Sequence, residues 1–238
     1  MLTGDRIGMN RKGLVNDEFA QAIRDYYLLL QRRYPQKALL KIIGDRFRLD
    51  STQRTVLFRG VVPGDKARMR RRRLHSSCRN RRLYLDGYNV LYTICNYLAG
   101  RTLFISNDGF LRDAGEIHAK SPSKEKMDEA ITVLLRFLNE HPPTYVKVIL
   151  DAPVSFSGEL SARLAELLNT NSLPGDAVTA RSADFPLRSV EYGLVASSDS
   201  AIIDSLLERK HCALFDFAYH ALKKYFDPSF IRLRAFTR

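Results

Sequence analysis

The feature that most constrains the fold is an alternation, from residue 82 onward, of short apolar runs with longer segments of helical periodicity. The apolar runs predict buried strands at residues 82–86, 145–150, 177–180, 192–196 and 212–215. Apolar residues spaced three and four apart predict helices at residues 90–99, 124–139, 157–168, 198–209 and 217–225. An Asn-Asp-Gly turn at residues 107–109 adds a predicted hairpin. Strands separated by helices favour an α/β fold, with a mainly parallel sheet and helices on both faces.

The first sixty residues are typical of a small all-helical module. Asn16 precedes an apolar stripe that begins at Phe19, as an N-cap residue would. Asp50 and Gln53 have the spacing of a capping box for a helix that ends before Gly60. Three short helices with a tight turn allow a helix-turn-helix that reads DNA, and they equally allow a plain packing module.

Positive charge is concentrated between these two regions. The chain carries a net charge of +12, and nine of the seventeen residues from Lys66 to Arg82 are Lys or Arg, with no acid among them. Such a segment attracts a polyanion, most often nucleic acid, although a solvated linker has the same composition. We therefore predict a helical module at residues 1–62, a basic linker at 63–82 and an α/β domain at 83–238. The predicted nucleic-acid contacts are Arg70, Arg71, Arg72, Arg73, Arg79, Arg81, Arg82 and Arg112.

Three predicted strands end in, or lead directly to, an aspartate. Asp86 and Asp151 come at the ends of two apolar runs, and Asp199 follows a third after two serines. The carboxyl ends of parallel strands share one edge of a sheet, where ligands bind. Carboxylates gathered there repel one another unless a cation neutralises them, and oxygen ligands suit Mg²⁺ or Mn²⁺. Each aspartate could instead cap the helix or turn that follows it.

The segment Leu85-Asp86-Gly87-Tyr88-Asn89-Val90-Leu91 resembles the first-strand signature of PIN-like nucleases of the NYN branch. The resemblance implies that Asp86 and Asp199 bind metal, and that Asp151 fits the branch with an acid after the second main strand. It also implies that Asn89 steadies the adjoining loop. Together with Asn89, Ser198 is predicted to support the ligands through hydrogen bonds. Asp204 is either a further supporting acid or a solvated surface residue.

One feature departs from the PIN pattern. Many PIN nucleases carry an acid on the helix after the first strand, and residues 90–99 contain none. Asp113 or Glu116 is the candidate replacement ligand. Arg112 could contact phosphate, or it could pair with Asp113.

Nearly the full chain is also similar to a largely prokaryotic family that joins a short helical module to such a domain. The resemblance is carried by Asp45-Arg46-Phe47-Arg48-Leu49, by Asp108-Gly109-Phe110-Leu111-Arg112-Asp113 and by Ser155-Phe156-Ser157-Gly158-Glu159-Leu160. This family brings no assigned activity.

The cysteine content and the lack of long apolar segments indicate in which compartment the protein is expected. Three widely separated cysteines and the absence of an apolar leader or an 18-residue apolar run favour a reducing, cytoplasmic location without membrane insertion. The oligomeric state is left open, including a homo-oligomer.

The leading hypothesis is a nuclease that depends on Mg²⁺ or Mn²⁺, with RNA favoured over DNA as substrate. In the first alternative, a non-catalytic protein binds RNA or DNA on the same scaffold. In the second, a phosphatase acts on a small substrate, which leaves the basic segment unexplained.

Overall fold

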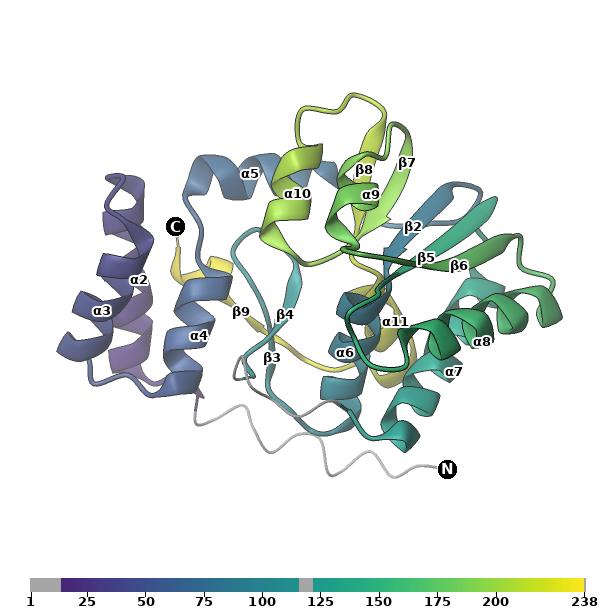
Figure 1. Cartoon of the computed structure of the whole chain (residues 1–238). Coiled ribbons are helices and arrows are strands. Elements are labelled where there is room, and N and C mark those ends of the chain that lie inside the picture. The colour runs from purple at the N-terminus through teal and green to yellow at the C-terminus, as the bar shows by residue number, and fades with distance from the viewer. Residues whose placement is uncertain (1–13, 116–121, 238) are drawn as a thin grey trace. The chain divides into compact units, whose positions relative to one another are not determined.

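The computed structural model describes residues 14–115 and 122–237, which form two compact units (Figure 1). The first, here called the helical unit, comprises Met1–Arg71, Asn96–Ser121 and Ser229–Arg238. The second, the parallel-sheet unit, comprises Arg72–Cys95 and Pro122–Pro228. The predicted boundaries at residues 62 and 82 therefore differ from the observed ones, because an internal segment and the last residues join the N-terminal helices. Glu116 lies outside the described residues.

Three helices open the helical unit: α2 (Asp17–Gln31), α3 (Gln36–Arg46) and α4 (Ser51–Gly60). Their predicted caps are confirmed. The Asn16 side chain accepts a hydrogen bond of 2.8 Å from the Phe19 backbone, and Asp50 and Gln53 form both bonds of a capping box. α3 continues through Gly44 to Arg46, so this glycine does not end the helix.

The hairpin and the C-terminal segment complete this unit. β3 (Leu103–Ile105) pairs antiparallel with β4 (Leu111–Asp113), as predicted, and parallel with β9 (Ile231–Arg232), which the 3-10 helix η2 (Leu233–Phe236) follows. Phe104 and Leu233 are fully buried in the same apolar cluster as Phe19 and Ile23 of α2. The apolar stripe of the N-terminal helices is thus covered by residues about 80 and 210 positions away.

The predicted basic linker is largely a helix, α5 (Gly64–Arg73). Arginine has a high helix propensity, and Pro63 stands just before the helix, where a proline is tolerated. A charged run therefore indicates a linker only when nothing packs against it, and here Ala67 and Arg70 are buried.

The parallel-sheet unit contains six strands in the order β1-β8-β7-β2-β5-β6, all parallel. Their bounds are β1 (Leu74–His75), β2 (Arg82–Asp86), β5 (Tyr145–Asp151), β6 (Gly175–Ala180), β7 (Gly193–Ala196) and β8 (Cys212–Phe215). The inner strands are buried on both faces, as in β5, where residues 148–150 are consecutive buried apolar residues. The predicted parallel α/β architecture is confirmed.

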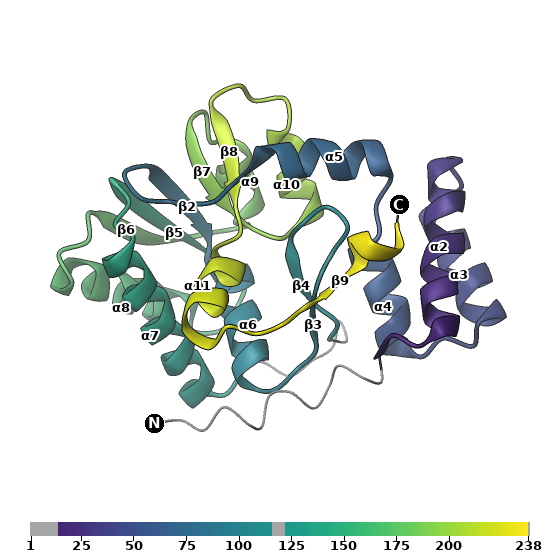
Figure 2. The same ribbon diagram turned by 180° about the vertical axis from the view of Figure 1, so that it is seen from behind.

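Helices flank this sheet: α6 (Gly87–Leu98), α7 (Lys124–Glu140), α8 (Ser157–Thr170), α9 (Asp184–Arg188), α10 (Ser200–Leu206) and α11 (Phe217–Phe226). Figures 1 and 2 show α7, α8 and α11 on one side of the strands, with α9 and α10 on the other. The apolar stripe of α7, centred on Leu134, is buried. Among the described residues, no helix combines the length and the apolar character needed to cross a bilayer.

Candidate carboxylate site

The strand order of the parallel sheet reverses direction at β2. The chain proceeds from β2 outward to β5 and β6 and then returns to β7, on the opposite side of β2. Such a reversal separates the connections that follow β2 and β7, which opens a crevice at their carboxyl ends. Asp86 is the last residue of β2. Because Leu85 is paired with Ala196, Asp86 is level with Ser197 at this crevice.

Asp86 is held at the end of its strand by an immediate turn into α6. Gly87 begins the helix directly, and a Cβ on Gly87 would lie 2.5 Å from the Leu150 side chain and 3.0 Å from the Ile149 carbonyl. Only glycine fits this close approach. The tight turn leaves the Asp86 side chain buried, with 6% of its surface exposed.

Burial determines the ionisation of Asp86. Its pKa is raised to about 7, chiefly because the buried carboxylate loses hydration. The negative charges of Asp151 and Asp199 raise the pKa as well. Hydrogen bonds from Ser197 and from the Asn89 backbone act in the opposite direction. The carboxylate therefore lies in surroundings that lack compensating positive charge.

Ser197 connects two of the predicted site residues. Its hydroxyl donates a hydrogen bond of 2.7 Å to Asp86 Oδ2 and accepts one of 3.0 Å from the backbone N–H of Asp199. Asp199 Oδ1 in turn accepts from the backbones of Ala201 and Ile202, at 2.7 and 3.1 Å, and so caps α10. Asp199 thus has the capping role foreseen as its alternative, next to Asp86 rather than far from it.

Asn89 and Ser198, predicted as supporting residues, contact each other. Asn89 Oδ1 accepts hydrogen bonds from the Ser198 backbone at 2.9 Å and from its hydroxyl at 3.1 Å. These bonds join the first turn of α6 to the segment after β7. They fix the two chain segments that carry Asp86 and Asp199 relative to each other.

Asp151 ends the neighbouring strand β5. Asp86 is paired with Ile149, so Asp151 lies two residues further along and on the same face of the sheet. Its Oδ1 atom accepts a hydrogen bond of 2.8 Å from the backbone of Ala183, just before α9. Three carboxylates from three strands thus share one edge, as the sequence predicted.

The donor set fits an oxygen-preferring divalent cation. It consists of carboxylate oxygens, and the negative charges of Asp151 and Asp199, which contribute to the raised pKa of Asp86 beside its burial, would be offset by a cation. Across residues 14–115 and 122–237, however, no group of three or more His, Cys, Asp or Glu side chains is close enough to hold a metal ion. A site here would therefore use one or two carboxylates, and water or substrate oxygens would complete the shell, as is common for Mg²⁺.

Asp113, the predicted extra ligand, has another partner. It belongs to the helical unit, where its carboxylate forms an ion pair of 2.8 Å with Arg59 at the end of α4. The pairing with Arg112 that the sequence suggested is replaced by this one, because Arg112 binds Asp108. Asp204, the other additional acid, lies on α10, one turn beyond Ser200.

The structure differs from the prediction at two of the nucleic-acid-binding arginines. Arg70 and Arg112 are 1% and 2% exposed, and both bind the fully buried Asp108, with N···O distances of 2.6 and 2.8 Å. They neutralise the carboxylate inside the helical unit and cannot reach a nucleic acid at the surface.

Of the remaining six predicted arginines, three donate hydrogen bonds to backbone carbonyls and three are exposed at a pocket. Arg71 donates to the Asn107 carbonyl, Arg79 to the Glu140 carbonyl, and Arg73 to the carbonyls of Leu207, Arg209 and Cys212. Arg72, Arg81 and Arg82 are exposed and line one pocket. Of the predicted binding run, these three are the best placed for a ligand.

Several residues near the carboxylates were missed by sequence reasoning. Ser197 was passed over although it stands between a strand and Asp199, which is the available signal. Phe185 and Phe156 follow β6 and β5 and are 78% and 75% exposed. Apolar residues in loops between predicted elements could have drawn attention to both. Arg181, exposed directly after β6, gave no distinguishing signal.

Comparisons with known proteins give two family matches and one relative. A model described as "Protein of unknown function (DUF434)" matches residues 18–73, and one described as "Domain of unknown function (DUF5616)" matches residues 75–212. "Uncharacterized protein MJ0935" of Methanocaldococcus jannaschii is 28% identical over 187 residues, which cover 78% of this chain and 88% of the relative. No solved structure matches. Because the second model covers more than half of the chain, the protein belongs to the family described as "Domain of unknown function (DUF5616)".

Proposed function

We propose that this protein is a phosphodiester hydrolase that depends on a divalent cation and acts on RNA. The observation that carries the proposal is Asp86, a buried carboxylate at the switch point of a parallel sheet whose pKa is raised to about 7. Perturbed acids in a crevice are characteristic of functional sites. Mg²⁺ or Mn²⁺ bound there would supply an activated water and would neutralise charge on the scissile phosphate.

Each carboxylate has a separable task in this proposal. Asp86 provides a direct oxygen ligand, and Ser197 keeps that carboxylate oriented. Asp199 and Asp151 each bind backbone N–H groups through Oδ1, which leaves Oδ2 as the oxygen for water or cation contact. Asn89 keeps the two segments at a constant separation through its bonds to Ser198.

Aromatic side chains at the same edge favour a nucleic-acid substrate over a small phosphate ester. Phe185 comes two residues after Ala183, whose backbone binds Asp151, and Phe156 precedes α8. Exposed phenyl rings are stacking surfaces for unpaired bases. Single-stranded RNA, with its bases accessible, is the substrate that we expect.

The finer fold assignment is also a proposal. A PIN-like domain is supported by the central position of β2, by the aspartate at its end and by Asn89 in the following turn. The helical unit, whose residues 96–121 interrupt the parallel-sheet unit and whose residues 229–238 follow it, sets this chain apart from a single-domain nuclease. The expected location is the cytoplasm.

The decisive experiment measures cleavage of a labelled single-stranded RNA with Mg²⁺, with Mn²⁺ or with excess chelator. Wild type should cleave with either metal and lose activity with chelator. Asp86→Asn should lower the rate at least about 100-fold, as loss of a metal ligand does. Asp227→Asn is the matched control, because Asp227 is 79% exposed, pairs with Lys223 and has a left-handed backbone that asparagine tolerates. Equal rates for the two variants would exclude the metal-site mechanism.

A second function is favoured by the capping bonds. Asp199 caps α10 and Asp151 accepts a hydrogen bond from the Ala183 backbone, so both aspartates have a structural role that needs no metal. A non-catalytic RNA-binding protein on the same scaffold would keep these bonds. It would bind the labelled RNA without cleaving it under any of the three metal conditions.

A further inference from the structure

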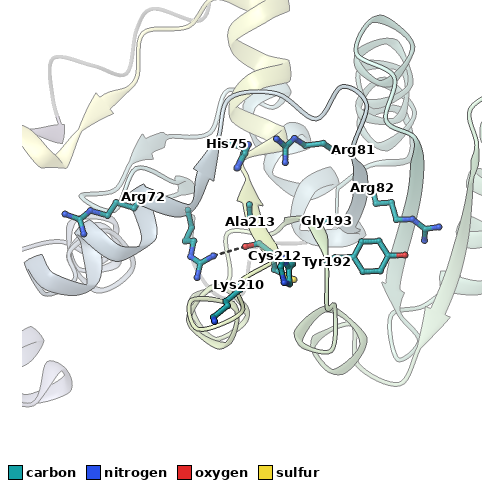
Figure 3. Close-up of a pocket in the computed structure, with 11 residues that line it drawn as sticks. Arg72, His75, Arg81, Arg82, Tyr192, Gly193, Lys210, Cys212 and Ala213 are labelled. Atoms are coloured by element: carbon teal, nitrogen blue, oxygen red, sulfur yellow. Dashed lines mark hydrogen bonds between the residues drawn. The ribbon is translucent and has the colours of Figure 1, made fainter.

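A second candidate site lies at the opposite edge of the parallel sheet, where the strands begin. Residues just before or at the starts of β2, β7 and β8 surround a pocket of about 440 Å³ (Figure 3). Its lining includes Arg81, Arg82, His75, Lys210 and Tyr192. β2 is five residues long, about 17 Å, so one phosphate group cannot contact both this pocket and Asp86.

The pocket gathers positive charge without a compensating acid. Five Lys or Arg side chains and two His side chains line it, and within the described part of the chain no Asp or Glu does. Among residues 14–115 and 122–237, neither Arg81 nor Lys210 forms an ion pair, and both are exposed. Burial and the charge of Arg81 lower the pKa of His75, as expected where cations crowd one another. A bound anion would relieve this repulsion.

Arg73 also lines the pocket, but its role there is structural. Its guanidinium donates to the carbonyls of Leu207, Arg209 and Cys212 at 2.6 to 3.1 Å, one of which is drawn in Figure 3. Leu207 and Arg209 follow α10, and Cys212 begins β8. Arg73 thereby fixes the backbone from which Lys210 projects.

An aromatic ring stands beside the charges. Tyr192 is 51% exposed, and the Arg82 guanidinium lies 5.3 Å from its ring centroid. The next residue, Gly193, has φ of +113°, and a Cβ there would lie 2.9 Å from the Arg82 carbonyl. The chain at Tyr192 is therefore held by a glycine turn that other residues would strain.

We propose that this pocket binds a short single-stranded segment of nucleic acid, with phosphates on Arg81 and Lys210 and a base against Tyr192. Cations that follow the backbone together with an exposed ring that stacks on a base form the usual surface for single strands. Phosphate alone would leave the exposed part of the Tyr192 ring, beyond its contact with Arg82, without a ligand. The site is separate from the carboxylate edge and does not rest on the hydrolase proposal.

The test measures binding of the full chain to a fluorescein-labelled ten-residue oligouridylate by anisotropy, with chelator present. Arg81→Gln combined with Lys210→Gln should weaken binding about tenfold and reduce the salt slope by about 1.4, as expected for two lost phosphate contacts on a single strand. Tyr192→Ala should weaken binding at least about fivefold, and Tyr192→Phe should restore it. The charge-matched control is Lys37→Gln with Lys41→Gln, both exposed on α3.

Competition identifies the ligand. Free uridine monophosphate that competes as well per nucleotide as unlabelled oligouridylate would point to a mononucleotide site and overturn the strand assignment. A polyglutamate peptide that competes equally would overturn the nucleotide chemistry. Equal affinity of the pocket variant and the α3 control, with unchanged melting curves, would overturn the site itself.

Discussion

Two aspartates, one in each unit, are buried and yet differ in their ionisation. Asp108 is fully buried in the helical unit, where burial alone would raise its pKa, but the charges of Arg112 and Arg70 hold the pKa well below its usual range. Asp86 is buried almost as fully in the parallel-sheet unit, and its pKa is raised to about 7. The two carboxylates have comparable solvent exposure, so the difference comes from their partners.

The comparison teaches how to separate structural from functional acids. Asp108 has two arginines that satisfy its charge permanently, which is how a fold keeps a buried ion. Asp86 has hydroxyl and backbone donors and two further aspartates as neighbours, and a proton or a cation would offset the negative charge that these donors leave uncompensated. Asp86, whose negative charge none of the described arginines neutralises, is therefore the acid to test for a catalytic role.

The largest expected effect is on the compensated acid. Asp108→Asn should lower the free energy of unfolding by about 3–5 kcal/mol, because it leaves two buried guanidinium groups without a counter-charge. Urea unfolding measures the loss. Asp113→Asn, which breaks the partly exposed pair with Arg59, should cost about 1 kcal/mol or less. Equal losses for the two variants would mean that burial does not distinguish these pairs.

The uncompensated acid should respond in the opposite direction. The folded pKa of Asp86, about 7, lies above its unfolded value near 3.8, so the folded state holds the proton more tightly. The associated stability is complete below about pH 4 and is lost as the pH rises to about 7. In chelator, Asp86→Asn should therefore be more stable than wild type at pH 8 by up to about 4 kcal/mol, and the advantage should shrink towards pH 4. An advantage independent of pH would show that Asp86 titrates normally.

A divalent cation should stabilise the parallel-sheet unit in place of the proton. At a concentration about 100 times its dissociation constant, Mn²⁺ should add about 2.7 kcal/mol to the free energy of unfolding of wild type. The increment should be larger at pH 8 than at pH 6, because the proton competes for Asp86, and it should vanish in Asp86→Asn. Thermal melts with and without Mn²⁺ provide the measurement, with Asp227→Asn as the variant that should keep the full increment.

The smallest expected effect on stability comes from removing the Ser197 hydroxyl, which lies between Asp86 and Asp199. Ser197→Ala removes the hydrogen bond that lowers the pKa of Asp86, so that pKa should rise further. In the metal-free protein the loss should be about 1 kcal/mol, and the pH dependence of stability should extend to higher pH. Ser205→Ala is the control, since the Ser205 hydroxyl bonds only to a carbonyl within α10 among the described residues. Identical pH profiles for the two variants would separate Ser197 from the ionisation of Asp86.

Local sequence signals predicted most of the architecture. Caps at Asn16 and Asp50, the Asn-Asp-Gly hairpin and the alternation of strands with helices all depend on residues close together in the chain. The ends of the strands placed Asp86, Asp151 and Asp199 at a common edge, because parallel strands necessarily align their carboxyl ends. The same reasoning could not supply Phe185, whose exposure depends on what packs around a short helix.

The amino-acid sequence by itself thus determined the α/β class, the capped starts of α2 and α4 and the strands that lead to acids, since periodicity and capping act within a few residues. Tertiary structure alone decided which charges are compensated. One arginine of α5, Arg70, is buried on Asp108, Arg73 is bound to carbonyls, and Arg72 is exposed in a pocket. These outcomes depend on segments about 40 to 140 residues away. Electrostatic free energy is set by such spatial neighbours and by burial, and neither can be read from the order of residues along the chain.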